Sequence, residues 1–79
     1  MNNKSKYNKI FMDCFSISEK DLNSELLYNS TPAWDSVGHM TLIGDIEEAF
    51  SVVLEMDDII ELSSFDKGIE ILSKHGIMF

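Results

Sequence analysis

The sequence predicts an all-α protein, a small four-helix bundle with a long loop after its first helix and a short third helix. Two observations lead to this prediction. Apolar residues recur every three or four positions over several segments, as they do along one face of a helix. The one β-branched stretch, residues 51–54, has no obvious partner strand, and we interpret it as a buried connector. Because 79 residues suffice for one small core, we expect a single domain over residues 1–79.

The first helix is expected over about residues 4–15. Its apolar residues have the spacing of one helix face, and the polar residues between them belong in water. Cys14 lies on the apolar face, so we interpret it as part of the core. As the only cysteine of the chain it cannot form an internal disulfide. The apolar residues of this segment are Tyr7, Ile10, Phe11, Cys14 and Phe15.

Residues 16–35 show no sustained period and are expected to form a long loop. Loops of this length in small domains generally have a function or are packed by their own side chains. Pro32 disfavours helical geometry at Thr31. We expect Trp34 to insert the end of the loop into the core, because an indole ring buries a large apolar area. Four apolar residues are spaced as further anchors of the loop: Ile17, Leu22, Leu26 and Leu27.

A second helix is expected over residues 36–50. Asp35 or Ser36 can cap it, since either side chain can accept hydrogen bonds from the unpaired N–H groups of a first turn. Gly44 costs about 1 kcal/mol relative to alanine inside a helix, and we expect it to permit the close approach of another helix. Leu42 is placed at the flank of the apolar face. That face is expected to comprise Val37, Met40, Ile43, Ile46, Ala49 and Phe50.

Two more helices are expected over about residues 56–62 and 64–75. Acidic residues at the start of the shorter one suit the positive end of a helix dipole. A serine followed three residues later by an acidic residue is typical of a capping box, and a glycine is typical of a helix end. The acidic residues at the start of the third helix are Asp57 and Asp58. The capping box of the fourth helix is formed by Ser63 and Asp66, and Gly76 marks the end of that helix.

The composition is acidic, with six basic and fourteen acidic residues and a formal net charge of −8. Such a surface repels phosphate backbones and anionic membranes, so we expect neither a nucleic acid nor a membrane as partner. It favours basic patches on other proteins. No signal peptide and no stretch of 18 apolar residues is visible, and the single cysteine suits a reducing compartment. We therefore expect a cytoplasmic protein, and a monomer.

Ser36 and His39 are neighbours at helical spacing, which suggests a nucleophile and a base. Hydrolysis also needs an oriented base, an oxyanion hole and a cleft, for which the sequence gives no sign. His39, His75 and Cys14 lack the spacing of metal ligands, so we expect no catalytic and no metal-binding residues. A serine at a helix start nevertheless has a distinct property. The first-turn N–H groups and the helix dipole favour a negative charge there, above all a phosphate.

The Asp35-Ser36-Val37 motif resembles that of the acyl carrier protein family. The helix that follows it ends Ile46-Glu47-Glu48-Ala49-Phe50, and this ending, the acidity and the chain length strengthen the resemblance. It covers most of the chain. It implies the acyl-carrier-protein type of four-helix bundle and a covalent cofactor, 4′-phosphopantetheine, attached to Ser36. The arm would carry acyl or aminoacyl groups as thioesters, and the protein would not itself be an enzyme.

The resemblance also implies roles for neighbouring residues. Asp35 would help present Ser36 to a phosphopantetheinyl transferase, and Val37 and Met40 would line the patch over which the arm lies, although Met40 can equally be a core residue. His39 could touch the phosphate of the arm, but we expect it to be exposed without a role. The partners would be the transferase and an acyl or aminoacyl ligase, acyltransferase or synthase. These partners would contact three acidic residues of this chain, which can equally form a face that is only exposed to water: Asp45, Glu47 and Glu48.

Some features depart from the fatty-acid type of carrier. Val37 replaces the usual leucine, and Gly38-His39 stands where acidic or polar residues are common. The motif is more similar to that of discrete carriers in specialised pathways, such as polyketide, peptide or surface-polysaccharide biosynthesis. An alternative from another class remains open. The chain could be an acidic helical adaptor, or a degenerate carrier, that binds a basic protein without a cofactor.

Overall fold

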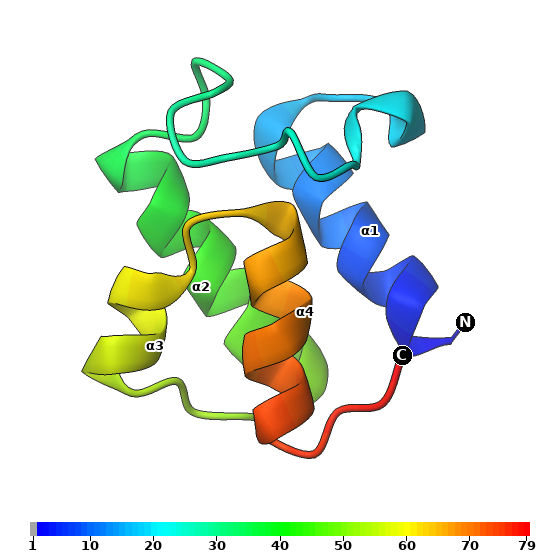
Figure 1. Cartoon of the computed structure of the whole chain (residues 1–79), viewed down its shortest axis with the longest axis vertical. Coiled ribbons are helices and arrows are strands. Elements are labelled where there is room, and N and C mark those ends of the chain that lie inside the picture. Colours follow the sequence, from blue (N-terminus) through cyan, green and yellow to red (C-terminus); the bar gives the residue numbers. More distant parts are fainter. Residues whose placement is uncertain (1) are drawn as a thin grey trace.

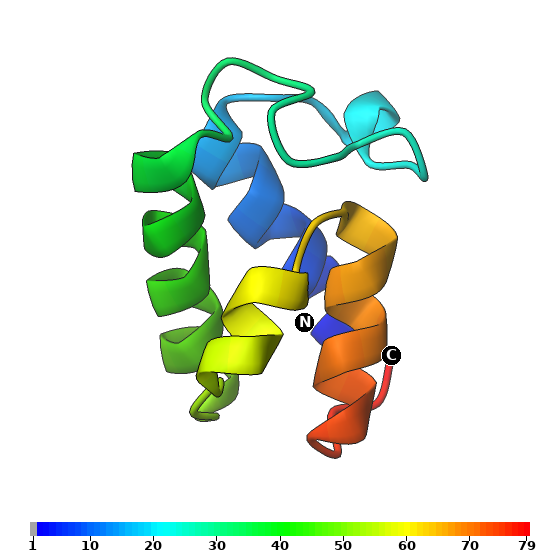
Figure 2. The same ribbon diagram turned by 60° about the vertical axis from the view of Figure 1, so that its left-hand side comes forward.

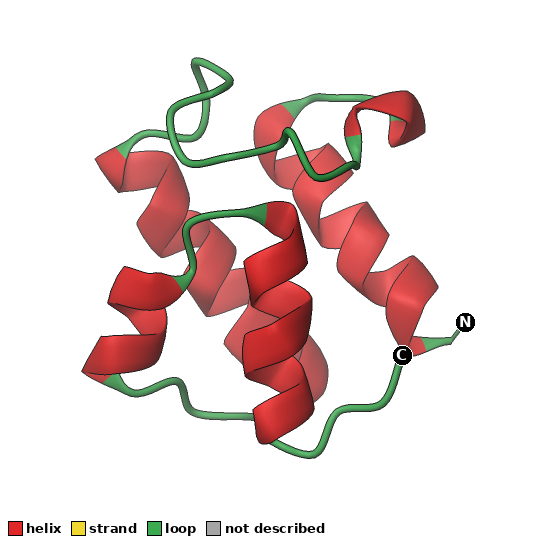
Figure 3. Cartoon of the chain, viewed as in Figure 1, coloured by secondary structure: helices red, strands yellow, loops and turns green. Residues whose placement is uncertain are grey.

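The computed structural model describes residues 2–79 and contains four α-helices and no strands over that range (Figures 1 and 3). The prediction of an all-α protein is thereby confirmed. A 3₁₀ helix, η1 (Glu19–Asp21), lies in the long first loop. Each observed helix begins and ends within one residue of its predicted bounds. The helices are α1 (Asn3–Phe15), α2 (Ser36–Phe50), α3 (Met56–Glu61) and α4 (Phe65–Lys74).

The long loop crosses the end of the molecule where α1 ends and α2 and α4 begin (Figures 1 and 2). Its backbone is tied to the junction between α3 and α4. Tyr28 N donates to Ser63 O at 2.9 Å, and Phe65 N donates to Leu26 O at 2.9 Å, on either side of an isolated bridge between Leu27 and Ser64. This attachment places the loop beside α3 and α4 as well as beside the helix that follows it.

This bridge also explains the one wrong prediction of a cap. Ser64, and not Ser63, caps α4, with its Oγ accepting from Lys67 N at 2.9 Å. Ser63 uses its carbonyl oxygen to pair with Tyr28 of the loop. The chain therefore stays extended through the bridge, and α4 begins one residue later than a cap at Ser63 would place it.

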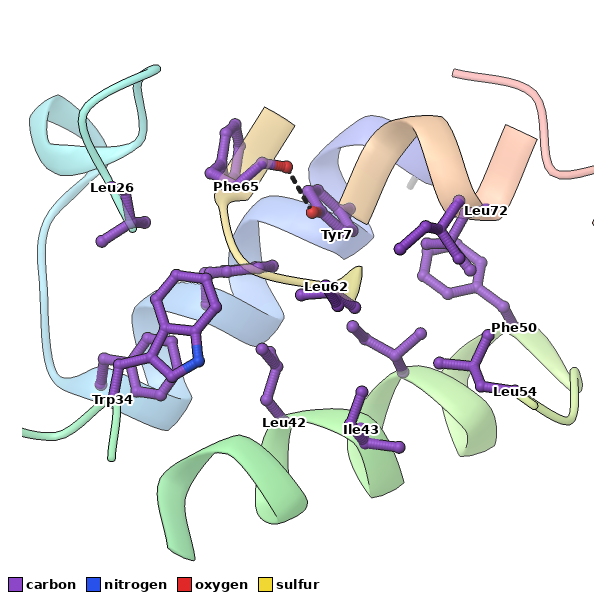
Figure 4. Packing of buried hydrophobic residues seen from close by; sticks show 14 residues of the cluster. Tyr7, Leu26, Trp34, Leu42, Ile43, Phe50, Leu54, Leu62, Phe65 and Leu72 are labelled. Atoms are coloured by element: carbon purple, nitrogen blue, oxygen red, sulfur yellow. Dashed lines mark hydrogen bonds between the residues drawn. The ribbon is translucent and has the colours of Figure 1, made fainter. Parts of the chain in front are cut away.

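Fourteen buried apolar side chains form the core (Figure 4). The apolar face of α1 is confirmed by the buried Tyr7, Phe11 and Phe15, whereas Ile10 and Cys14 are only partly buried. Tyr7 Oη donates to the carbonyl oxygen of Phe65 at 2.6 Å, which joins α1 to the start of α4 and satisfies a buried hydroxyl. Trp34 is fully buried, and its ring stacks on that of Phe15 with centroids 5.1 Å apart.

The buried face of α2 differs from the predicted one. Leu42 is fully buried rather than at the flank, together with Ile43, Ile46 and Phe50. Val37 and Met40 are exposed, at 76% and 57% of their surface. The helical period explains this: Val37 precedes Ile46 by nine residues, which is two and a half turns, so the two side chains lie on opposite sides.

Other segments approach α2 and α4 closely at Gly38 and Gly68, and not at Gly44, where a close approach was predicted. A β-carbon on Gly44 would meet nothing within 4 Å, so the expected helix contact there is wrong. A β-carbon on Gly38 would collide with the carbonyl oxygen of Ala33, and one on Gly68 with the hydroxyl of Tyr7. Gly38 thus lets the end of the loop pack on the first turn of α2, and Gly68 lets α4 pack on α1. Gly76, with φ of 87°, ends α4 as predicted.

The loop anchors are confirmed in part. Leu26 is buried, and Ile17 and Leu22 are partly buried against the core. Leu27 is 47% exposed and is not an anchor. Consecutive side chains of an extended segment point to opposite sides, so Leu27 faces outward where Leu26 faces the core. The connector at residues 51–54 is not a strand, but the prediction that it is buried holds only in part, because Leu54 is buried and Val53 is 81% exposed.

Asp58 is a buried acidic residue of α3 that holds the end of α4. Its carboxylate lies 2.8 Å from His75 Nε2 and 3.9 Å from Lys74 Nζ, and it accepts a hydrogen bond from Glu55 N. The hydrogen bond from His75 is the largest of the influences that lower the pKa of Asp58 below its ordinary value of 3.8. The charged form is therefore favoured in the folded protein.

Because the folded-state pKa of Asp58 is depressed, its contribution to stability is present above the ordinary carboxyl pKa and is lost as pH falls through the folded value. Asp58→Asn is therefore expected to lower the free energy of unfolding at neutral pH and to make its loss in acid shallower. Urea unfolding at neutral pH and at about pH 3 measures both effects. Asp57→Asn, at an exposed neighbour, is the control. Equal acid sensitivity of Asp58→Asn and the wild type would contradict this assignment.

Candidate functional site

The candidate site is centred on Ser36, the first residue of α2. Asp35 is the cap of this helix, because its Oδ1 accepts a hydrogen bond from Gly38 N at 2.8 Å. Of the two cap residues that the sequence allowed, Asp35 and Ser36, the structure therefore uses Asp35. The Ser36 hydroxyl is exposed and is not used in capping. Its Oγ lies 3.2 Å from the hydroxyl of Tyr28 in the long loop. An exposed hydroxyl thus stands at the positive end of a 15-residue helix.

His39, one turn into α2, is half-buried and bridges two other segments. Trp34 Nε1 donates to His39 Nδ1 at 3.0 Å, and His39 Nε2 lies 2.8 Å from the carbonyl oxygen of Ile59 in α3. The expectation of an exposed residue without a role is wrong. It fails because His39 precedes Leu42 and Ile43 by three and four residues, and so shares their buried face.

The Ser36–His39 pair does not form the contact of a nucleophile with its base. Both ring nitrogens of His39 are engaged, one with Trp34 and the other with Ile59. The Ser36 hydroxyl has Tyr28 as its neighbour instead. The local geometry therefore exposes the Ser36 oxygen without a base in contact with it.

A groove of about 250 Å³ lies between α2, α3 and the long loop. It reaches the candidate site through Tyr28, which lines the groove and contacts Ser36. Its walls are mostly apolar and its full lining is Tyr28, His39, Ile59, Ile60, Leu62 and Ser63. A larger hollow of about 410 Å³ is lined by residues of the loop, and its lining does not include Tyr28. Neither hollow is lined by a predicted site residue, and we assign the smaller groove to the site because Tyr28 links it to Ser36.

Val37 and Met40 are both surface residues of α2 near Ser36. The alternative that Met40 is a core residue is excluded by its exposure of 57%. On the neighbouring helix, Ile60 is 71% exposed and lines the groove. Ile60 is therefore the exposed apolar side chain of the groove itself, whereas Val37 and Met40 do not line it.

The three acidic residues predicted to contact partners have different surroundings. Glu48 is exposed. Glu47 is half-buried, and its carboxylate accepts from Leu54 N at 2.8 Å, so it holds the connector after α2. Asp45 is exposed but lies 3.9 Å from Cys14 Sγ. Burial and the Asp45 carboxylate raise the pKa of the Cys14 thiol, which keeps it protonated and poorly reactive.

Residues 2–79 contain neither a metal site nor a membrane span. No cluster of three metal-ligating side chains occurs among residues 2–79. Within the same range no helix combines the length and the apolar character needed to cross a bilayer. Comparison of the chain with protein-family models, with curated proteins and with solved structures gives no match. The function must therefore be argued from the site itself.

Proposed function

We propose that the protein is a carrier of the acyl-carrier-protein type. It holds acyl or aminoacyl groups as thioesters on a 4′-phosphopantetheine arm attached to Ser36 and presents them to partner enzymes. One observation carries this proposal: the exposed Ser36 hydroxyl begins a long helix whose cap is supplied by a different residue, Asp35. The four helices, the long first loop and the short α3 agree with the fold that the resemblance implies.

The position of Ser36 suits a phosphodiester. A phosphopantetheinyl transferase, with coenzyme A and Mg²⁺, would join the Ser36 oxygen to the phosphorus that bears the pantetheine. The Ser36 proton and the adenosine bisphosphate would leave. The new negative charge lies at the positive end of α2, where the helix dipole stabilises it by about 0.3–1 kcal/mol. Because Gly38 N already pairs with Asp35, the phosphate gains from the dipole and from the remaining first-turn N–H groups.

The surface next to Ser36 offers room for the arm. Val37 and Met40 supply exposed apolar contacts, and the groove behind Tyr28 can take the far end of the arm or a small carried group. The thioester is reactive toward nucleophiles, and the flexible tether raises its effective concentration at each enzyme that the carrier visits. A role in a specialised pathway, whether polyketide, peptide or surface-polysaccharide biosynthesis, is supported by the departures at Val37 and at Gly38-His39.

The partners in this proposal are the transferase and an acyl or aminoacyl ligase, acyltransferase or synthase with a basic surface. Glu48 and Asp45 are the acidic side chains of α2 that are exposed to such a surface. Glu47 is less available, because its carboxylate already pairs with Leu54 N. The proposal places the protein in the cytoplasm as a monomer.

The carrier function is tested by intact mass spectrometry after incubation with coenzyme A, Mg²⁺ and a promiscuous transferase. We expect a gain of one phosphopantetheine in the wild type and in Ser24→Ala, a control at another exposed serine. Ser36→Ala is expected to show no gain. Absence of a gain in the wild type with several transferases, or a full gain in Ser36→Ala, would refute the proposal.

The second candidate is an acidic adaptor or degenerate carrier that binds a basic protein without a cofactor. The net charge of −8 is the observation that favours it. It predicts that Ser36→Ala keeps function in cells, whereas charge reversal on α2 abolishes it. Glu48→Lys is the better reversal, because Glu47→Lys would also break the bond to Leu54 N.

A further inference from the structure

His39 connects the three segments that surround the groove. It belongs to α2, it accepts a hydrogen bond from Trp34 at the end of the loop, and its other nitrogen contacts Ile59 of α3. Its ring is parallel to the Trp34 ring within 16° and meets the Tyr28 ring edge-on with centroids 5.6 Å apart. The loop end that it holds leads directly into Asp35 and Ser36.

These contacts require one protonation state of His39. The indole nitrogen of Trp34 is a donor only, so His39 Nδ1 must carry a lone pair and accept. The carbonyl of Ile59 is an acceptor only, so Nε2 must carry the proton and donate. Both bonds therefore exist only with the neutral Nε2–H tautomer. In the imidazolium, Nδ1–H would face the indole N–H, and two donors cannot form a hydrogen bond.

We propose that His39 is a proton-sensitive positioning residue, whose neutral form ties the loop end beside Ser36 to α2 and α3 and whose protonation releases the Trp34 indole. Trp34 is fully buried, so its N–H would then lack a partner away from water. The loop end must shift to satisfy it. Since Tyr28 of the same loop lines the groove and contacts Ser36, the groove and the setting of Ser36 become pH-dependent.

The charged surroundings of His39 do not offset this effect. From the loop it faces Tyr28, whose hydroxyl is next to Ser36. On its own helix, Asp35 directs its carboxylate to Gly38 N. The α3 segment offers His39 a backbone carbonyl, and its buried Asp58 carboxylate is engaged by His75. No carboxylate lies within ion-pair distance of His39 in the chain from residue 2 to residue 79.

His75, the other histidine of the chain, makes a contact that protonation strengthens. His75 Nε2 meets the Asp58 carboxylate at 2.8 Å, and an imidazolium strengthens this contact into an ion pair. Protonation of His75 therefore tightens the contact of α3 with the end of α4, whereas protonation of His39 loosens the contact of α2 with the loop. His75 thus provides an internal control, because its protonation predicts an effect of opposite sign.

The test uses Trp34, the only tryptophan, as a reporter in the protein without any modification at Ser36. Its indole N–H signal is followed by ¹⁵N–¹H correlation NMR from about pH 8 to pH 5, alongside the Cε1–H signals of both histidines. We expect the indole signal to move with the titration of His39. Its hydrogen-exchange protection, corrected for intrinsic rates, is expected to fall about fivefold, the factor that corresponds to one ordinary hydrogen bond.

His75→Gln is expected to keep this transition, and His39→Gln to lose it. An indole signal that stays constant while His39 titrates would overturn the proposal, and so would an unchanged transition in His39→Gln. The wild-type titration alone decides the matter if His39→Gln does not fold. The result is independent of the carrier function, because it concerns the chain before any arm is attached.

Discussion

Replacement of Trp34 with alanine is expected to lower the free energy of unfolding by about 3–5 kcal/mol, the range for a large aromatic removed from a core. Trp34 is fully buried, stacks on Phe15 and meets Phe11 edge-on. A chain of this size has a total stability of about 4–12 kcal/mol. The loss is therefore a large fraction of the whole, and urea unfolding followed by circular dichroism measures it.

Trp34→Phe is the matched control for this prediction. It keeps most of the aromatic area but removes the N–H that donates to His39 Nδ1. We expect a smaller loss, in which the missing hydrogen bond accounts for about 1 kcal/mol. A loss as large in Trp34→Phe as in Trp34→Ala would show that the hydrogen bond, and not the buried area, dominates.

Gly68→Ala is expected to destabilise the protein by about 1–3 kcal/mol. The new methyl group would collide with the Tyr7 hydroxyl, and Tyr7 could move away only by breaking its buried hydrogen bond to Phe65 O. Gly44→Ala is expected to stabilise the protein by up to about 1 kcal/mol, because the site is open and alanine favours helix.

The two glycine variants form one experiment, since the same substitution at two helix interiors should change the unfolding midpoint in opposite directions. Urea denaturation with unchanged slope measures each shift. Equal shifts of the same sign would contradict the packing of α4 on Tyr7. Restoration of Gly68→Ala by Tyr7→Phe, which removes the hydroxyl, would confirm that this atom is the obstacle.

The helices could be predicted because their signals are local. The face of α1 is visible as the spacing of Tyr7, Phe11 and Phe15, and the observed bounds differ from the predicted ones by one residue at most. The errors arise where the orientation or role of a residue depends on a contact with a segment far along the chain. The bridge from Leu27 to Ser64 turns Leu27 outward and moves the α4 cap to Ser64. Nothing in the spacing of either segment reveals that pairing.

The helix start at the centre of the candidate site could be predicted, whereas the residues around it could not. The Asp-Ser motif indicated a helix start, and in the structure Asp35 caps α2 and Ser36 is its first residue. Tyr28 was missed because it lies eight residues upstream in a loop without a period. The role of His39 could have been found, since it shares the helix face of Ile43 and Ile46. The contact with Ile59 depends on how α3 folds back, which no local pattern encodes.

The pairing of the long loop with the junction of α3 and α4 also orders events during synthesis of the chain. The Leu26 carbonyl accepts from Phe65 N and the Tyr28 amide donates to Ser63 O, and both of these partners are translated much later. Local helices form within about a microsecond, whereas synthesis adds about 5–20 residues each second. The surroundings of Ser36 are therefore completed after the start of α4 has left the ribosome. Under the proposed carrier function, an enzyme that recognises the folded surroundings of Ser36 would modify only chains that have already passed this folding step.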